Sequence, residues 1–130
     1  MKYSVEAKQS DPVMSFVMHL LHSATNAHIQ HWTTRSFAAH EALGFFYEKM
    51  PVLLDAFVES FQGKFGILHD FIVDYKLPDP DPVKYLESLS EEVATLRREK
   101  RFPQDSELQN EVDNIANLIN STLYKLRFLA

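Results

Sequence analysis

Apolar residues recur at helical spacing in four separate stretches of this chain, and this periodicity constrains its fold more than any other feature. The four stripes comprise Val13, Phe16, Val17, Leu20, Leu21, Ala24 and Ala27; Leu43, Phe46, Met50, Leu53, Phe57 and Phe61; Val83, Leu86, Leu89, Val93 and Leu96; and Leu108, Val112, Ile115, Ile119, Thr122 and Leu126. No segment of useful length alternates apolar and polar residues as a half-buried strand does. The sequence therefore predicts an all-α protein.

Capping signals set the expected boundaries of these helices. Asp-Pro pairs at 11–12 and 81–82 suit a helix start, because Asp caps free N–H groups and Pro lacks one. Gly63 is a typical residue for a helix end. A basic cluster (Arg97, Arg98, Lys100 and Arg101) is expected at a helix C-terminus, where cations complement the helix dipole. The predicted helices cover 11–33, 36–62, 82–101 and 105–128.

The long connection between the second and third helices decides the topology. Residues 63–81 carry no clean helical stripe, apart from a short helix expected at 67–75, and the proline-rich end at 77–82 favours an extended backbone. Pro51 should kink the second helix, because it removes one helical hydrogen bond. Two hairpins joined by one long crossover predict a single domain over residues 1–130, with the topology of a ferritin-like four-helix bundle.

Composition excludes several function classes. The chain has no cysteine, so disulfides, zinc-thiolate sites and a cysteine nucleophile are ruled out. A net charge of -5 argues against nucleic-acid binding and DNA compaction, which depend on Lys and Arg. No apolar stretch is long enough to span a bilayer, and the start of the chain lacks a signal-peptide pattern. We expect a soluble, cytoplasmic protein without a membrane partner.

Histidine is the residue type that calls for an explanation, since five of the six histidines lie between His19 and His40. Five polar side chains are predicted on the inward helix faces: His28, His31, His40, Asp55 and Glu59. A tight turn after the first helix should bring His31 and His40 together. Asp55 and Glu59 are four residues apart, so their carboxylates can hold one ion.

These carboxylates cannot meet His40 within one chain. Along a helix they lie ~22 Å and ~28 Å beyond it, although Asp55 looks toward the same side. Two copies packed antiparallel about a two-fold axis would bring the histidines of one chain to the carboxylates of the other. Such mixed ligands suit iron, manganese or zinc. The sequence thus predicts a homodimer with two metal sites, in which His28 is an auxiliary ligand.

Structural roles are open to the same residues. A buried polar network at a dimer interface would also need these histidines and carboxylates to pair. His28 alone fits a hydrogen-bonded core histidine as well as a ligand. His19 and His22 are expected in structural or surface roles, and Trp32 in the core.

The motif His31-Trp32, His40-Glu41-Ala42-Leu43 and Asp55-x-x-x-Glu59 resembles the core signature of Dps proteins, which are small relatives of ferritin. The resemblance implies a ferroxidase site between subunits at a dimer two-fold, with His31, His40, Asp55 and Glu59 as iron ligands, in a shell of twelve subunits. Two departures stand out. The interval from His31 to His40 is three residues shorter than is usual, and Gly44 occupies the position of an expected carboxylate, either as a lost ligand or as a close helix contact.

A second resemblance favours a different class of function. His28-x-x-His31, Arg35-Ser36-x-Ala38-Ala39-His40 and Glu59-x-x-Gln62-Gly63-Lys64 look like an uncharacterised ferritin-like family common in bacteriophages. It implies a location in a bacterial or phage-infected host cell and no particular activity. The alternative function is therefore that of a non-enzymatic structural or interaction protein, whose polar cluster serves dimerisation.

Overall fold

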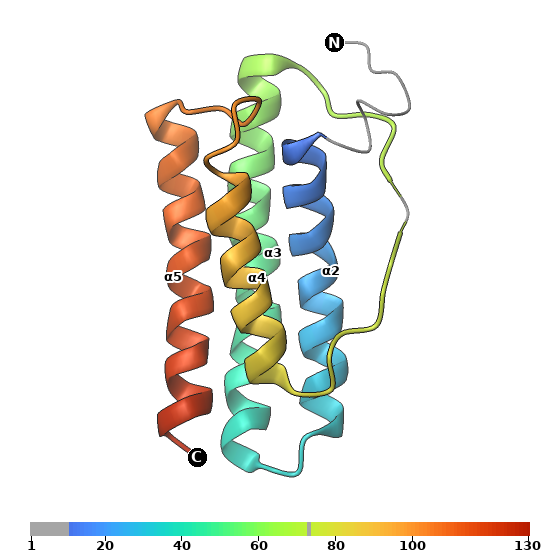
Figure 1. Cartoon of the computed structure of the whole chain (residues 1–130), viewed down its shortest axis with the longest axis vertical. Helices are drawn as coiled ribbons and strands as arrows, with labels where there is room; N and C mark the ends of the chain where they lie inside the picture. Colours follow the sequence, from blue (N-terminus) through green and yellow to red (C-terminus); the bar gives the residue numbers. More distant parts are fainter. Residues whose placement is uncertain (1–10, 73) are drawn as a thin grey trace.

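Four long α-helices form the part of the chain that the computed structural model describes, residues 11–72 and 74–130 (Figure 1). They are α2 (Pro12–Thr33), α3 (Phe37–Phe65), α4 (Pro82–Leu96) and α5 (Ser106–Phe128). Within these described residues there is no strand, so the predicted all-α class is confirmed. Among the same residues, no helix has the length and hydropathy needed to cross a membrane.

The helices begin where the capping residues predict. The Asp11 carboxylate accepts a hydrogen bond from the Val13 amide at 2.9 Å, and Asp81 accepts one from Val83 at the same distance. The Ser36 hydroxyl caps α3 by accepting from the Ala39 amide at 3.2 Å. Each side chain thereby satisfies an amide that the first helical turn leaves without a partner.

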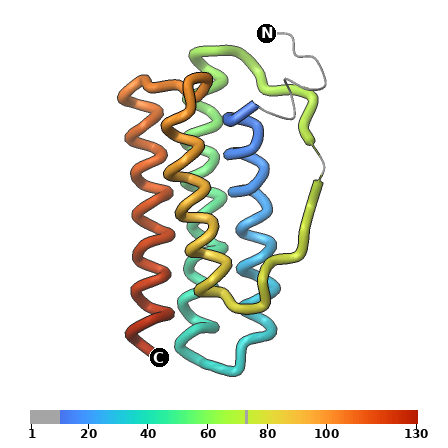
Figure 2. The backbone as a smooth tube through the Cα atoms, viewed as in Figure 1, coloured from blue at the N-terminus to red at the C-terminus, as the bar shows by residue number. Residues whose placement is uncertain are grey.

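The helices pair as two antiparallel hairpins, α2 with α3 and α4 with α5 (Figure 1). The long connection after α3 runs back along the bundle to the end where α3 began, so α3 and α4 point in the same direction (Figure 2). Around the bundle, α3 packs against both α2 and α5, while α4 packs against α5 and more lightly against α2. The hairpins joined by one crossover thus have the connectivity that the sequence predicts.

The core lies along the predicted apolar stripes and contains one aromatic cluster that the stripes do not fully include. Phe16 of α2 contacts Phe57 of α3, with ring centroids 4.8 Å apart. Phe102, from the loop between α4 and α5, completes the cluster at 5.2 Å from the Phe16 ring. All three are almost fully buried. Phe102 escaped the periodicity analysis because it lies in a turn, where helical spacing carries no information.

Several predicted boundaries were wrong. Helix α3 continues past Gly63 to Phe65 and is capped by Gly66, whose φ of 101° is one that glycine adopts readily. Pro51 lies inside this helix. Helix α4 ends at Leu96 rather than at 101, so most of the basic cluster lies in the following turn. The described part of 67–75 is not helical.

Buried amides of α2 hold the crossover in place. Asn26, only 5 % exposed, donates to the Tyr85 hydroxyl of α4 at 3.0 Å and accepts from the Tyr75 hydroxyl of the crossover at 2.6 Å. One turn further along α2, Gln30 donates to the main-chain carbonyl of Asp79 at 2.8 Å. These bonds give an extended segment fixed polar anchors, although Oε1 of Gln30 is itself buried without a hydrogen-bond partner among the described residues.

Candidate functional site

His31 and His40 lie on either side of the turn between α2 and α3 and contact one another directly. Their imidazole rings are stacked, with centroids 3.6 Å apart and planes at 17°. Nδ1 of His31 is 2.6 Å from the main-chain oxygen of His40, and Nδ1 of His40 is 2.8 Å from the main-chain oxygen of His31. The predicted meeting of the two histidines is therefore confirmed, and each side chain is bonded to the other residue's backbone.

These two hydrogen bonds fix which nitrogen carries the proton. A carbonyl oxygen can only accept, so Nδ1 of each ring is the donor. In the neutral imidazole the remaining nitrogen, Nε2, then holds a lone pair. Histidines that bind metals in proteins are commonly held in this way, with one ring N–H bonded to an acceptor such as a carbonyl and the other nitrogen coordinating the metal. Both rings thus have the tautomer that a metal ligand needs.

The stacking limits how an ion can use this pair. A metal bound to Nε2 lies in the plane of the imidazole at about 2.1 Å, because the lone pair lies in that plane. The two rings are nearly parallel and stacked, with centroids 3.6 Å apart, so their lone pairs lie in separate planes that do not share such a point. One ion can therefore bind either ring as it stands, and it binds both only if one ring turns.

Gly44 provides the surface on which the His31 ring rests. A Cβ atom at this position would lie 3.2 Å from Cε1 and 3.3 Å from Nδ1 of His31, which is closer than ordinary van der Waals contact. The absence of a side chain at Gly44 thus allows α2 and α3 to approach each other closely at this point. The carboxylate that the Dps pattern expects at Gly44 would have to displace the His31 ring.

His28 is enclosed by aromatic rings. It stacks on Tyr47 of α3, with centroids 3.9 Å apart and planes at 11°, and it lies 4.5 Å from the Trp32 ring. Its centroid is 6.0 Å from that of His31. His28 is therefore part of the packing that supports His31. Its side chain is half-buried and does not belong to the hydrophobic core.

Asp55 and Glu59 lie elsewhere on α3, and the prediction that they face inward was wrong. Both side chains are exposed. Neither makes a hydrogen bond or ion pair with another residue in the described part of the chain. Across residues 11–72 and 74–130, no three histidine, aspartate or glutamate side chains gather closely enough to hold a metal. A single chain therefore does not form the predicted site.

Exposed aromatic residues border the histidine pair. Trp32 is 68 % exposed, so its predicted core position was wrong, and Phe37 at the start of α3 is 77 % exposed. Phe37 also stacks loosely on His40, with centroids 6.3 Å apart. Large exposed aromatic side chains next to polar groups are typical of surfaces that contact another protein.

The remaining histidines have structural partners, as the sequence predicts for His19 and His22. His19 of α2 pairs through Nδ1 with the Glu92 carboxylate of α4 at 2.7 Å. The hydrogen bond to Glu92 raises the pKa of His19 above its ordinary value, although burial acts in the opposite direction. His22 packs edge-on against the ring of Tyr75, and His69 contacts Asp70 in the crossover.

Comparisons with known proteins assign the chain to a family. Curated proteins gave no match to this sequence, and solved structures gave none either. A family model matches residues 31–126, which run from the first histidine of the pair to the last turn of α5. The chain therefore belongs to the family of unknown function DUF5856.

Proposed function

We propose that this protein is a ferritin-like homodimer, related to Dps, that binds iron or a similar divalent metal between subunits. His31 and His40 of one subunit would supply imidazole ligands, and Asp55 and Glu59 of the other would supply carboxylates. The observation that carries the proposal is the pair of Nδ1–carbonyl hydrogen bonds, which leaves both Nε2 atoms free.

Two further observations support it. The carboxylates of Asp55 and Glu59 are exposed and have no bonded partner among the described residues, so they are free to meet a ligand. The two antiparallel hairpins joined by one crossover are the connectivity of ferritin-like bundles. The donor set suits Fe, Mn or Zn. Bound iron would be a substrate for oxidation by oxygen or peroxide, and the larger assembly would be the Dps shell.

The role of this chain's own residues is to present ligands. Gly44 lets the His31 ring lie against α3, and the packing of His28 on Tyr47 buttresses that ring from the preceding turn. Binding through both Nε2 atoms requires one stacked ring to turn and give up its Nδ1–carbonyl bond, so metal and partner subunit together would have to select that arrangement.

The test is metal binding by wild type and by variants that remove only the proposed ligand atoms. His31→Asn with His40→Asn keeps an amide N–H near each Nδ1 position and removes Nε2. Asp55→Asn with Glu59→Gln removes the negative charges. Anaerobic Fe(II) titration of purified wild type should show saturable binding, and both double variants should lose it. Glu91→Gln, an exposed change on α4, serves as the control.

Mixing the two double variants tests whether the site is shared. Co-expressed with different tags, the histidine variant and the carboxylate variant would form a heterodimer with one complete site of two. It should recover about half of the wild-type metal content. No saturable binding by the wild type, or no recovery in an isolated heterodimer, would refute the metal proposal.

The second candidate is a structural or interaction protein whose α2–α3 face binds a second copy of the chain without a metal. The exposed rings of Trp32 and Phe37 beside the stacked histidines favour it. Elemental analysis distinguishes the two, because this candidate forms its complex without stoichiometric metal. Replacing Trp32 and Phe37 by serine should then abolish self-association detected by light scattering.

A further inference from the structure

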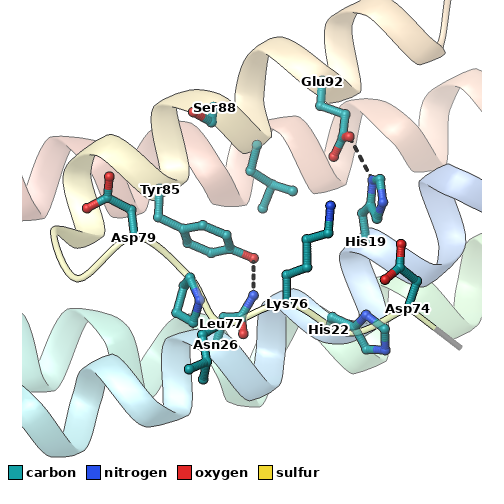
Figure 3. A pocket seen from close by; sticks show the side chains of 12 residues that line it. His19, His22, Asn26, Asp74, Lys76, Leu77, Asp79, Tyr85, Ser88 and Glu92 are labelled. Atoms are coloured by element: carbon teal, nitrogen blue, oxygen red, sulfur yellow. Dashed lines mark hydrogen bonds and ion pairs between the residues drawn. The ribbon is translucent and has the colours of Figure 1, made fainter.

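A cavity separate from the α2–α3 turn lies between α2, the crossover and α4 (Figure 3). Its volume is about 350 Å³, within the range of small-molecule sites. His19 and Asn26 of α2, Asp74 and Lys76 of the crossover, and Tyr85 of α4 are among the residues that line it. The proposed metal chemistry uses none of these residues.

The wall of the cavity is built from fixed polar groups. Asn26 joins the Tyr75 and Tyr85 hydroxyls, and its side chain is almost fully buried. On the opposite side, His19 and Glu92 form an ion pair between α2 and α4 (Figure 3). Hydrogen bonds and an ion pair thus tie together side chains of α2, the crossover and α4 around this space.

Tyr85 retains an unused donor. The Asn26 side chain contacts it through Nδ2, which can only donate, so the Tyr85 oxygen is the acceptor in that bond. The hydroxyl hydrogen then has no acceptor among the described residues. Burial raises the pKa of Tyr85 to about 12, which keeps the hydroxyl protonated at neutral pH.

Two opposite charges in the cavity, Lys76 and Asp74, act on His19 only as coulombic neighbours. Lys76 and Asp74 are two residues apart on the extended crossover, so their side chains lie on the same side of it. Neither forms an ion pair or hydrogen bond with another residue in the described part of the chain. Figure 3 shows the Lys76 side chain reaching into the space between α2 and α4.

This arrangement selects a ligand that carries both charges. A simple anion that met Lys76 and the Tyr85 hydroxyl would also face the carboxylates of Asp74 and Glu92. A simple cation would face Lys76. The side chains of Leu77 and Leu89, with Pro78, add an apolar part of the wall. A small molecule with a carboxylate, an ammonium and an aliphatic body matches all of these groups.

We infer that the cavity binds a small zwitterion of the α-amino-acid class. Its carboxylate would accept hydrogen bonds from Lys76 and the Tyr85 hydroxyl, and its ammonium would lie by Asp74, since Glu92 is already paired with His19. The inference holds whether or not the protein binds a metal at the α2–α3 turn.

Three probes of similar shape test the charge requirement by calorimetric titration of the full chain. L-leucine has both charges, 4-methylpentanoate has only the carboxylate, and 3-methylbutylamine has only the ammonium. We expect saturable binding of L-leucine and at least tenfold weaker binding of the other two, which corresponds to ~1.4 kcal/mol. No saturable heat with L-leucine, or equal affinity for a singly charged probe, would overturn the inference.

Variants locate the binding. Lys76→Met and Asp74→Asn change exposed side chains, so the fold should be retained, and each should weaken L-leucine binding about tenfold. Lys84→Met changes an exposed lysine of α4 that does not line the cavity and should leave affinity unchanged. Full affinity in both cavity variants would place the binding elsewhere and refute this site.

Discussion

His31 and His40 close the turn between α2 and α3 by reciprocal hydrogen bonds, each ring donating to the main-chain carbonyl of the other residue. Carbonyls at the end of a helix normally lack a partner within it. Here the His31 carbonyl, in the last turn of α2, accepts from the His40 ring. The histidine pair therefore stabilises the shortest connection of the bundle, and any metal-binding role is superimposed on this structural one.

Gly44→Ala should destabilise the protein because the His31 ring cannot move aside without breaking its hydrogen bond. The added methyl would meet that ring at 3.2 Å. Overpacking costs roughly 1–3 kcal/mol, and the better helix propensity of alanine offsets part of it. We expect a net loss of about 1 kcal/mol in the free energy of unfolding, measured with urea.

Gly63→Ala is the matched control for this substitution. Gly63 lies within the same helix, and a Cβ there would have no atom within 4 Å. Alanine should therefore stabilise the protein by about 0.5–1 kcal/mol. Equal effects of the two substitutions would show that the contact between Gly44 and His31 is unimportant.

Arg97→Lys should loosen the junction between α4 and α5. The Arg97 guanidinium donates to the Gln109 side chain at 2.9 Å, to its carbonyl at 3.2 Å and to Asp113 at 2.6 Å. Lysine has a single ammonium and cannot reproduce this planar set of bonds. We expect a loss of about 1–2 kcal/mol in urea unfolding. Arg98→Lys, at an exposed neighbouring position, should change stability little, and an equal loss there would contradict this account.

Tyr75→Phe should release the crossover from α2. The substitution removes the hydroxyl that donates to the buried Asn26 oxygen at 2.6 Å. Leaving the buried Asn26 oxygen without a donor should cost about 1–3 kcal/mol in the free energy that holds the crossover against α2. Because the crossover then opens more often, proteases should cut it faster. Tyr124→Phe removes an exposed hydroxyl on α5 and serves as the control. An unchanged cleavage rate in Tyr75→Phe would show that this bond does not hold the segment.

Sequence periodicity predicted the helices and the core because one buried face repeats regularly along each helix. Leu43, Phe46 and Met50 are fully buried as predicted. The same reasoning placed Asp55 inside, since a periodic pattern gives the angle around a helix but not how many sides of it are covered. Asp55 lies on a side of α3 that no other helix covers within the described chain, and it is exposed.

Contacts between distant segments were beyond the reach of pattern analysis. The meeting of His31 and His40 was predictable, because a short turn leaves little freedom. Asn26 gave no such signal, although it joins two tyrosines that lie 49 and 59 residues away. Its partners depend on where the crossover runs, and proline geometry shows only that the crossover is extended.

The ion pair between His19 and Glu92 should make stability depend on pH in a direction that its chemistry fixes. The hydrogen bond to Glu92 raises the pKa of folded His19 above the value near 6.5 that the unfolded chain has. The stabilisation is therefore fully present below that unfolded pKa and is lost as the pH rises through the folded pKa.

Glu92→Gln removes the charge that favours protonated His19. The difference in unfolding free energy between wild type and this variant should be larger near pH 6 than near pH 9. Glu87→Gln is a control, because Glu87 pairs with Arg127, which stays charged over this range. Its difference from wild type should be flat, whereas a flat difference for Glu92→Gln would exclude the His19 pair as a source of pH dependence.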